Sequence, residues 1–223
     1  MGCNSYDFKR ALNYLRRMIL RIDKDNPDDR RIGQVVDCLR NGGVIIYPTD
    51  TVYTLGCDIS NREAYEKICK LKGIKPNKAN FSFVCYDLSH ISEYTISLPT
   101  PTYKLMKSLL PGPFTFILNA NKTIQRIFGY KKKEVGIRVP NHAIPRAIVQ
   151  ALGHPILSAS IKNDDEILEY TTDPEEIHHQ YDDIVDIVID GGFGLNEPST
   201  IIDYTGKQAH LVRQGLGEID LID

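Results

Sequence analysis

The sequence predicts a single α/β domain, and three observations support that class. Segments with strand-like and helix-like patterns alternate along the chain, and no low-complexity linker separates them. The 223 residues are 42% hydrophobic, and with the 16 glycines this share is typical of soluble folded domains, so the chain can bury a full core. The five cysteines are widely spread and form no CxxC pair, which argues against a disulfide framework or structural zinc.

The elements of the first half are predicted from apolar spacing and from the residues that end each segment. Residues 5–17 show helical spacing. The helix over 28–40 presents Ile32, Val35 and Leu39 on one face, and Asn41 with two glycines ends it. After residue 17, the expected elements are a strand over 18–22, a helix over 28–40, a strand over 44–47, a helix over 62–71 and a strand over 81–86.

The second half continues the alternation, but the pattern does not fix the order of strands in the sheet. Asp173 before Pro174 is typical of a helix start, and Gly153 of a helix end. The expected helices cover 103–110, 144–152 and 174–180, and the expected strands cover 114–118, 135–139, 155–160, 184–189, 200–203 and 210–213.

The charge distribution is strongly asymmetric although the net charge is only -2. Residues 1–140 hold 23 Lys and Arg against 13 Asp and Glu, whereas residues 141–223 hold 4 against 16. A basic portion of this size favours an anionic ligand, a nucleotide or a nucleic acid, unless the two halves interleave in space. No apolar stretch approaches the roughly 18 residues of a membrane span, so no membrane contact and a cytoplasmic location are expected.

Familiar catalytic signatures are absent, and the informative residues stand at strand ends. No GxxxxGK[ST], GxSxG or HExxH motif occurs, and the glycines of 191–194 are interpreted as a plain turn. Thr49 and Thr51 flank Asp50 after an apolar strand, and Arg138 ends another such strand. Open α/β sheets gather ligands at such ends, but the hydroxyls could equally cap turns, and the arginine could equally form a structural ion pair.

Five ordered segments make the chain resemble a known family. They are PTDTVYTLG at 48–56, PGPFTFIL at 111–118, VGIRVP at 135–140, PILSAS at 155–160 and STIIDYT at 199–205, followed by LVR before Gly215. Their order resembles the YrdC-like family, which includes threonylcarbamoyl-AMP synthases, and within it the YciO branch. The resemblance runs from about Met18 to Asp220. It implies an N-terminal extension over 1–17 and one domain over 18–223.

The resemblance implies a fold and a reaction. The expected fold is a YrdC-like twisted mixed sheet flanked by helices, with a large basic cavity. The expected reaction joins L-threonine, bicarbonate and ATP, with Mg²⁺, into threonylcarbamoyl-AMP and pyrophosphate, which serves a tRNA modification. No protein nucleophile and no tightly bound protein metal are expected, because catalysis would rest on positioning and on cations that offset developing charge.

The resemblance also assigns residues. Arg138 would hold the threonine carboxylate, since a guanidinium can donate two parallel hydrogen bonds. The remaining substrate contacts would be Thr49, Thr51, Asn80, Thr115, Ser160, Ser199 and Thr200. The nucleotide side would be lined by Lys72, Lys75, Ser158 and Arg213.

Three departures from the family pattern fall on the nucleotide side. Ile74 stands where the family has the arginine of a KxR element, with Lys75 following. Lys162 replaces an asparagine after Ser160, and Leu168 falls where the family has another arginine. The sequence therefore predicts a synthase-like protein whose threonine side is better preserved than its nucleotide side.

Two other interpretations stay open. One is a protein that binds double-stranded RNA or tRNA without adenylation, with Lys131, Lys132 and Lys133 as phosphate contacts in an extended loop that also carries Lys122 and Arg126. No RRM-like aromatic motif is present, which argues against sequence-specific RNA recognition. The other is a small-molecule-binding paralogue with neither activity.

Overall fold

The computed structural model describes residues 18–128, 132–161, 172–206 and 208–219. Within these residues ten strands form one sheet in the order β1-β8-β2-β3-β7-β4-β6-β5-β9-β10. Neighbouring strands pair in both parallel and antiparallel senses, so the sheet is mixed, as predicted. The expected helix within 1–17 lies outside the described residues, as do Lys131, Lys162 and Leu168.

The strands occupy the positions that the apolar runs predict, with one addition. Their bounds are β1 Met18–Arg21, β2 Ile45–Tyr47, β3 Thr54–Asp58, β4 Ser82–Val84, β5 Phe114–Asn119, β6 Glu134–Arg138, β7 Ile156–Ser160, β8 Ile187–Asp190, β9 Thr200–Asp203 and β10 His210–Arg213. Strand β3 is not predicted by the sequence pattern. It pairs antiparallel with β2 on one side and with β7 on the other, so the polar turn after Tyr47 joins two neighbouring strands.

Capping side chains mark the starts of several helices. The α-helices are α2 Asp29–Arg40, α3 Arg62–Leu71, α4 Thr100–Leu109, α5 Lys122–Phe128, α6 Ala143–Leu152 and α7 Pro174–Tyr181, and the 3₁₀ turns are η1 Pro76–Lys78 and η2 Ile91–Glu93. The side chains of Asp28, Asn61 and Asp173 accept backbone N–H groups at the starts of α2, α3 and α7. The expectation of an extended loop around Lys122 and Arg126 is wrong, because both residues lie on α5.

In the described part of the chain, two hydrophobic clusters form the core. Strand β2 shows how the alternation of a strand divides them, since Ile45 and Tyr47 join one cluster and Ile46 joins the other. The cluster that holds Ile45 and Tyr47 also contains the apolar faces of α2 and α6, which pack against each other. The cluster that holds Ile46 contains residues of α3.

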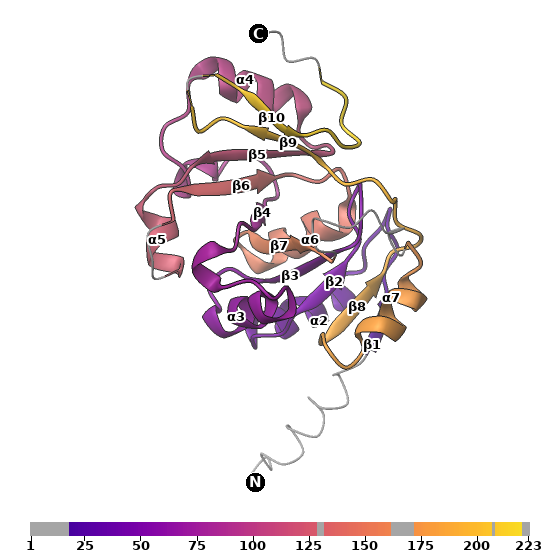
Figure 1. Cartoon of the computed structure of the whole chain (residues 1–223). Helices are drawn as coiled ribbons and strands as arrows, with labels where there is room; N and C mark the ends of the chain where they lie inside the picture. Colours follow the sequence, from indigo (N-terminus) through magenta and orange to yellow (C-terminus); the bar gives the residue numbers. More distant parts are fainter. Residues whose placement is uncertain (1–17, 129–131, 162–171, 207, 220–223) are drawn as a thin grey trace.

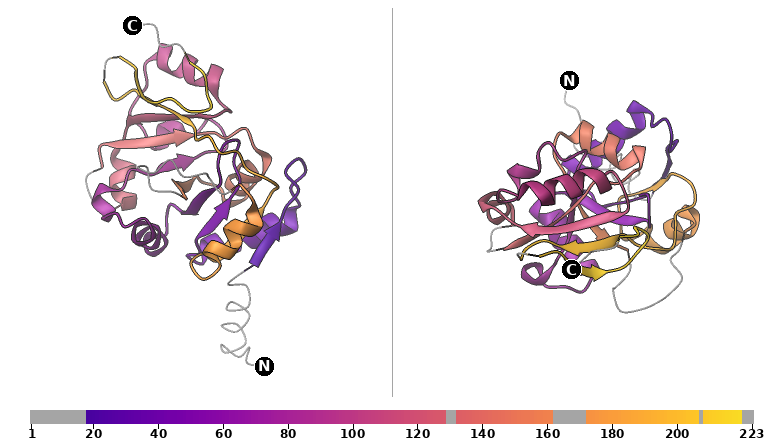
Figure 2. Two further views of the ribbon diagram at one scale, coloured as in Figure 1. Left: turned by 45° about the vertical axis from the view of Figure 1, so that its right-hand side comes forward. Right: turned by 90° about the horizontal axis from the view of Figure 1, so that it is seen from above.

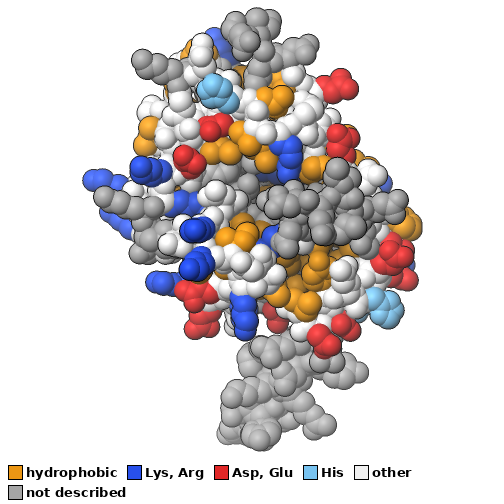
Figure 3. All heavy atoms as spheres, viewed as in Figure 1, with side chains coloured by type: hydrophobic (Ala, Val, Ile, Leu, Met, Phe, Trp, Pro, Cys, Tyr) orange, Lys and Arg blue, Asp and Glu red, His pale blue; other side chains and the backbone are white. Residues whose placement is uncertain are grey.

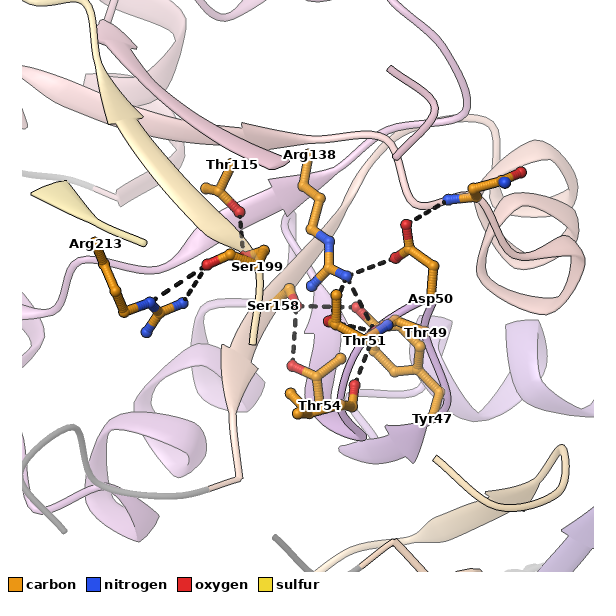
Figure 4. Close-up of polar contacts among 12 residues, drawn as sticks. Tyr47, Thr49, Asp50, Thr51, Thr54, Thr115, Arg138, Ser158, Ser199 and Arg213 are labelled. Atoms are coloured by element: carbon orange, nitrogen blue, oxygen red, sulfur yellow. Dashed lines mark hydrogen bonds and ion pairs between the residues drawn. The ribbon is translucent and has the colours of Figure 1, made fainter. Parts of the chain in front are cut away.

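The sheet turns as it crosses the molecule (Figures 1 and 2), with β1 and β8 at one end and β9 and β10 at the other. This twist brings the ends of β2, β6 and β7 and the start of β9 into one region, which Figure 4 shows at close range. In the described part of the chain, no helix is long and apolar enough to cross a membrane.

Candidate active site

The turn between β2 and β3 is built by its own hydroxyl groups. The Thr49 hydroxyl donates to the carbonyl of Val52 at 2.8 Å and accepts the N–H of Thr51 at 3.1 Å. The hydroxyls of Thr49 and Thr51 also lie 3.1 Å apart. Both side chains are buried, Thr51 with 0% exposure, so their oxygens are fixed in position.

Arg138 enters this turn from β6 and binds three of its oxygens. Its Nη2 lies 2.6 Å from Oδ1 of Asp50, 2.7 Å from Oγ1 of Thr51 and 3.1 Å from Oγ1 of Thr49 (Figure 4). The other carboxylate oxygen of Asp50 accepts the N–H of Asn141 at 2.9 Å. The guanidinium is therefore held in one orientation by residues that the sequence places far away.

The contacts of Arg138 confirm the predicted structural ion pair, and they are also compatible with the predicted binding of an anionic ligand. The ion pair with Asp50 exists, and both side chains are about nine-tenths buried. The Nε of Arg138 is also buried, yet it has no hydrogen-bond partner among the residues that the structure describes. A buried donor without an acceptor is costly, so the side chain retains hydrogen-bonding capacity for an anion. Asp50 was not among the predicted site residues, although an acid between two threonines was a visible signal.

A second hydroxyl group lies where β5 and β9 pair. Thr115 and Ser199 face each other with 2.9 Å between their hydroxyl oxygens. Arg213, from β10, donates from Nε and Nη2 to the carbonyl of Ser199 at 3.3 and 2.9 Å. In Figure 4 these residues and Arg138 with its partners lie in one region. Thr115, Ser199 and Arg213, which the family resemblance assigned to substrate or nucleotide, therefore lie together.

Thr200 occupies a different environment from its neighbour Ser199. Its side chain has 0% exposure, and its hydroxyl donates to the carbonyl of Gly217 at 2.6 Å while accepting the N–H of Gly215 at 2.9 Å. These contacts fasten the segment after β10 onto the sheet. The hydroxyl of Thr200 is thus bonded within the fold, whereas the family resemblance implied a substrate contact.

Ser158 is likewise part of an internal chain of hydroxyl groups. The Tyr47 hydroxyl donates to Ser158 at 3.0 Å, the Ser158 and Thr54 hydroxyls lie 3.1 Å apart, and Thr54 donates to the carbonyl of Ala159 at 2.6 Å. The proton of the Tyr47 hydroxyl points to Ser158, and that of the Thr54 hydroxyl points to the carbonyl of Ala159. In the contact between Ser158 and Thr54, Ser158 is therefore the donor. Burial raises the pKa of the Tyr47 phenol, which keeps it protonated. A nucleotide that contacted Ser158, as predicted, would have to compete with these hydrogen bonds between hydroxyl groups.

The nucleotide-side residues of the loop after α3 are more open. Lys72 donates from Nζ to the carbonyl of Ser160 at 3.0 Å, which joins this loop to the end of β7. Lys75 and Asn80 are exposed. Ile74 is partly buried and packs against the core, so an arginine at this position would have to abandon that packing.

The lysines proposed as RNA contacts do not share one environment. Lys133 is exposed, and so are Lys122 and Arg126 on α5. Lys132 is buried, however, with only 9% of its surface exposed. Figure 3 shows Lys and Arg side chains gathered on the side of the molecule that carries α3 and α5. The basic surface therefore exists, but Lys132 is not part of it.

A glycine-rich loop, residues 191–194, supports the turn between β2 and β3 that carries Thr49 and Thr51 (the threonine turn). The phenol of Tyr53 donates to the carbonyl of Gly192 at 2.7 Å and accepts the N–H of Gly191 at 3.2 Å. A Cβ at Gly191 would lie 2.7 Å from the ring of Pro48, which explains why glycine stands there. The N–H of Leu195 then donates to the carbonyl of Thr51 at 2.9 Å. The pattern of 191–194 predicted a plain turn and gave no sign of this support.

Comparison with known proteins identifies close relatives. Residues 37–215 match the model of a family named for Sua5, YciO and YrdC, whose description reads "Telomere recombination". The chain is 41% identical over 200 residues to the uncharacterized protein YciO of Escherichia coli, which covers 89% of this chain and 95% of that one. An uncharacterized protein of Haemophilus influenzae is 41% identical over 199 residues, covering 88% of this chain and 94% of its own.

Solved structures show the same fold. The crystal structure of Escherichia coli YciO superposes with a TM-score of 0.82 at 39% identity and covers 90% of this chain and 97% of that one. The Pyrococcus abyssi Sua5 structure complexed with L-threonine superposes with a TM-score of 0.79 at 23% identity, over 89% of this chain and 57% of that one. At this identity the second likeness concerns the fold alone.

Proposed function

Because this chain belongs to the Sua5/YciO/YrdC family, we propose that it is a nucleotidyltransferase-like enzyme that forms threonylcarbamoyl-adenylate from L-threonine, bicarbonate and ATP. The observation that carries the proposal is the guanidinium of Arg138, held beside the hydroxyls of Thr49 and Thr51, with an Nε that no group in the described part of the chain accepts from. A relative of the same fold has been solved with L-threonine bound. This line of support concerns the threonine side of the site.

Threonine recognition would use the polarity of this turn. The carboxylate of L-threonine would accept hydrogen bonds from Arg138, and a charge-assisted pair of this kind contributes about 1.5–3 kcal/mol. Asp50 keeps the guanidinium in place through Nη2, so the ligand does not have to order that side chain when it binds. The hydroxyls of Thr115 and Ser199 would offer further hydrogen bonds from the opposite side of the region.

The chemistry needs no nucleophile from the protein. The amine of threonine attacks the carbon derived from bicarbonate and forms a carbamate with loss of water. A carbamate oxygen then attacks the α-phosphate of ATP, and pyrophosphate leaves with the magnesium that accompanies the nucleotide. The role of the protein is to hold the carbamate and the α-phosphate in line and to place cations near the leaving group. Lys72 lies beside the end of β7 and Arg213 beside the start of β9, where each donates to a backbone carbonyl.

A product assay tests the proposal. The protein is incubated with ATP, L-threonine, bicarbonate and Mg²⁺, and both pyrophosphate and threonylcarbamoyl-adenylate are measured, with each substrate omitted in turn. We expect both products only in the complete mixture. Their absence at high enzyme concentration would refute synthase activity.

RNA binding is a second candidate function, favoured by the exposed cations on α5 and next to β6. Lys122, Arg126 and Lys133 could contact phosphates without reading sequence. Replacing these three residues by Ala should weaken RNA binding for all sequences and flatten its dependence on salt by roughly one log unit per lost contact. An RNA affinity that does not change with salt concentration, or no RNA binding at physiological salt, would eliminate RNA binding as the function.

A further inference from the structure

Lys132 is a buried lysine whose ammonium group has an identified acceptor. Its Nζ donates to the carbonyl of Ala79 at 2.5 Å and lies 5.2 Å from the centroid of the Phe128 ring. Only 9% of the residue is exposed, and burial lowers the pKa of Lys132 to about 8. Burying an ammonium group carries a large desolvation cost. A surface lysine would avoid that cost, so the placement of Lys132 calls for an explanation.

The acceptor belongs to the loop that carries the predicted nucleotide-side residues. This loop runs from Lys72 at the end of α3, through η1, to Asn80 before β4. Ala79 immediately precedes Asn80, and the N–H of Ala79 closes the 3₁₀ turn by donating to the carbonyl of Pro76 at 3.3 Å. Lys132 therefore binds the loop at the point where it leaves η1 and enters the sheet.

Among the described residues, three side chains fasten this loop, each at a different point. Lys72 binds the end of β7 through the carbonyl of Ser160. The phenol of Tyr65, on α3, donates to the carbonyl of Pro76. Lys132, from the segment before β6, holds Ala79. Between the last two attachments stand Lys78 and its exposed neighbour Asn77, and no other long-range side-chain hydrogen bond to the described residues 77–80 is found.

We propose that Lys132 is a positioning residue that fixes the 72–80 loop, and through it the side chains that would meet the nucleotide, rather than a contact for RNA. The part of this inference that concerns the nucleotide rests on the proposed function. The part that concerns the loop does not, because it follows from the contacts of Lys132 alone.

The experiment compares four variants of the full chain. Lys132→Met removes the ammonium group and keeps the length of the side chain, while Lys132→Gln keeps a hydrogen-bond donor without the charge. Lys133→Met is the matched control, since Lys133 is adjacent but exposed. Tyr65→Phe removes the neighbouring attachment at Pro76. Amide hydrogen exchange of Lys78 and Ala79 reports the loop, and the KM for ATP in pyrophosphate release and the Kd for L-threonine report the site.

We expect Lys132→Met to accelerate exchange at Lys78 and Ala79 by at least tenfold and to raise the KM for ATP several-fold, with the Kd for L-threonine unchanged. Lys132→Gln should recover part of both effects, and Lys133→Met should show neither. Unchanged exchange in a folded Lys132→Met protein would overturn the proposal. So would an equal loss of threonine affinity, which would indicate a general structural role. If no protein releases pyrophosphate, the proposed function fails, and the exchange result still decides the role of Lys132 in the loop.

Discussion

Arg138 and Asp50 stand 88 residues apart in the sequence and form an ion pair of 2.6 Å in which both side chains are about nine-tenths buried. The pair joins the end of β6 to the turn after β2. It also orients the guanidinium toward Thr49 and Thr51, which lie on either side of Asp50. One contact thus serves the fold and the geometry of the candidate site.

Removing one partner of this pair should cost more than removing both. Asp50→Ala leaves the guanidinium buried without its counter-ion, and we expect the free energy of unfolding to fall by about 3–5 kcal/mol. The double variant Asp50→Ala with Arg138→Met should recover part of this loss. Urea denaturation of the two single variants and the double variant measures the coupling. Strictly additive losses would show that the pair does not act as a unit.

Ser158 should matter for stability rather than for nucleotide binding. In Ser158→Ala the buried phenol of Tyr47 loses its acceptor, so the free energy of unfolding should fall by about 1–3 kcal/mol. Nucleotide affinity should stay unchanged. Ser160→Ala is the comparison, because Ser160 ends the same strand and is only half-buried. A variant with Ala at position 158 that unfolds like the wild type but loses nucleotide affinity would restore the predicted contact.

The local elements of this fold were predictable, and its long-range contacts were not. The helix Arg62–Leu71 matches its predicted bounds because Asn61 caps it and four buried apolar residues mark one face. Strand β3 was missed because its sequence, TLGCD, is poor in β-branched residues and follows a polar turn directly. Helix α5 was missed because its basic residues are typical of a solvated loop as well as of an exposed helix face.

The same limit applies to the candidate site. The sequence indicates Thr49, Thr51 and Arg138 because polar residues at strand ends are recognisable along the chain. It cannot indicate that Lys132 is buried while Lys133 is exposed, since a run of three lysines has no apolar period and the acceptor at Ala79 is 53 residues away. Nor does it show that the hydroxyls of Ser158 and Thr200 are committed to internal partners.

Tyr53 should influence the threonine turn without touching the ligand. Tyr53→Phe keeps the ring but removes both hydrogen bonds to Gly191 and Gly192, and with them the support behind Thr51. We expect the Kd for L-threonine to rise about 5- to 30-fold, which corresponds to roughly 1–2 kcal/mol. Calorimetric titration measures it, with Tyr86→Phe at an exposed tyrosine as the control. Equal affinities in the two variants would contradict the supporting role of the glycine-rich loop.

Lys132 should give the protein a pH-dependent stability term of known sign. Burial lowers its pKa to about 8 from 10.5, so between these values the unfolded chain holds the proton more tightly. The contribution of Lys132 to the free energy of unfolding should therefore rise as pH increases from 8 to 10.5, by at most about 3 kcal/mol. Burial raises the pKa of the Cys38 and Cys85 thiols to about 12, so their deprotonation in the unfolded chain also changes the stability in this window. The quantity to measure is therefore the difference between the wild type and Lys132→Met. A difference that does not change with pH would show that Lys132 keeps an ordinary pKa.

Calorimetric titration of L-threonine and of L-threoninol, which lacks the carboxylate, tests most directly whether Arg138 holds an amino-acid carboxylate at the threonine turn. We expect the wild type to bind L-threonine and Arg138→Met to weaken this binding by roughly a hundredfold. L-threoninol should bind both proteins with the same low affinity. If Arg138→Met binds L-threonine as tightly as the wild type does, or if the wild type binds L-threoninol as tightly as L-threonine, then Arg138 does not recognise the carboxylate of the amino acid.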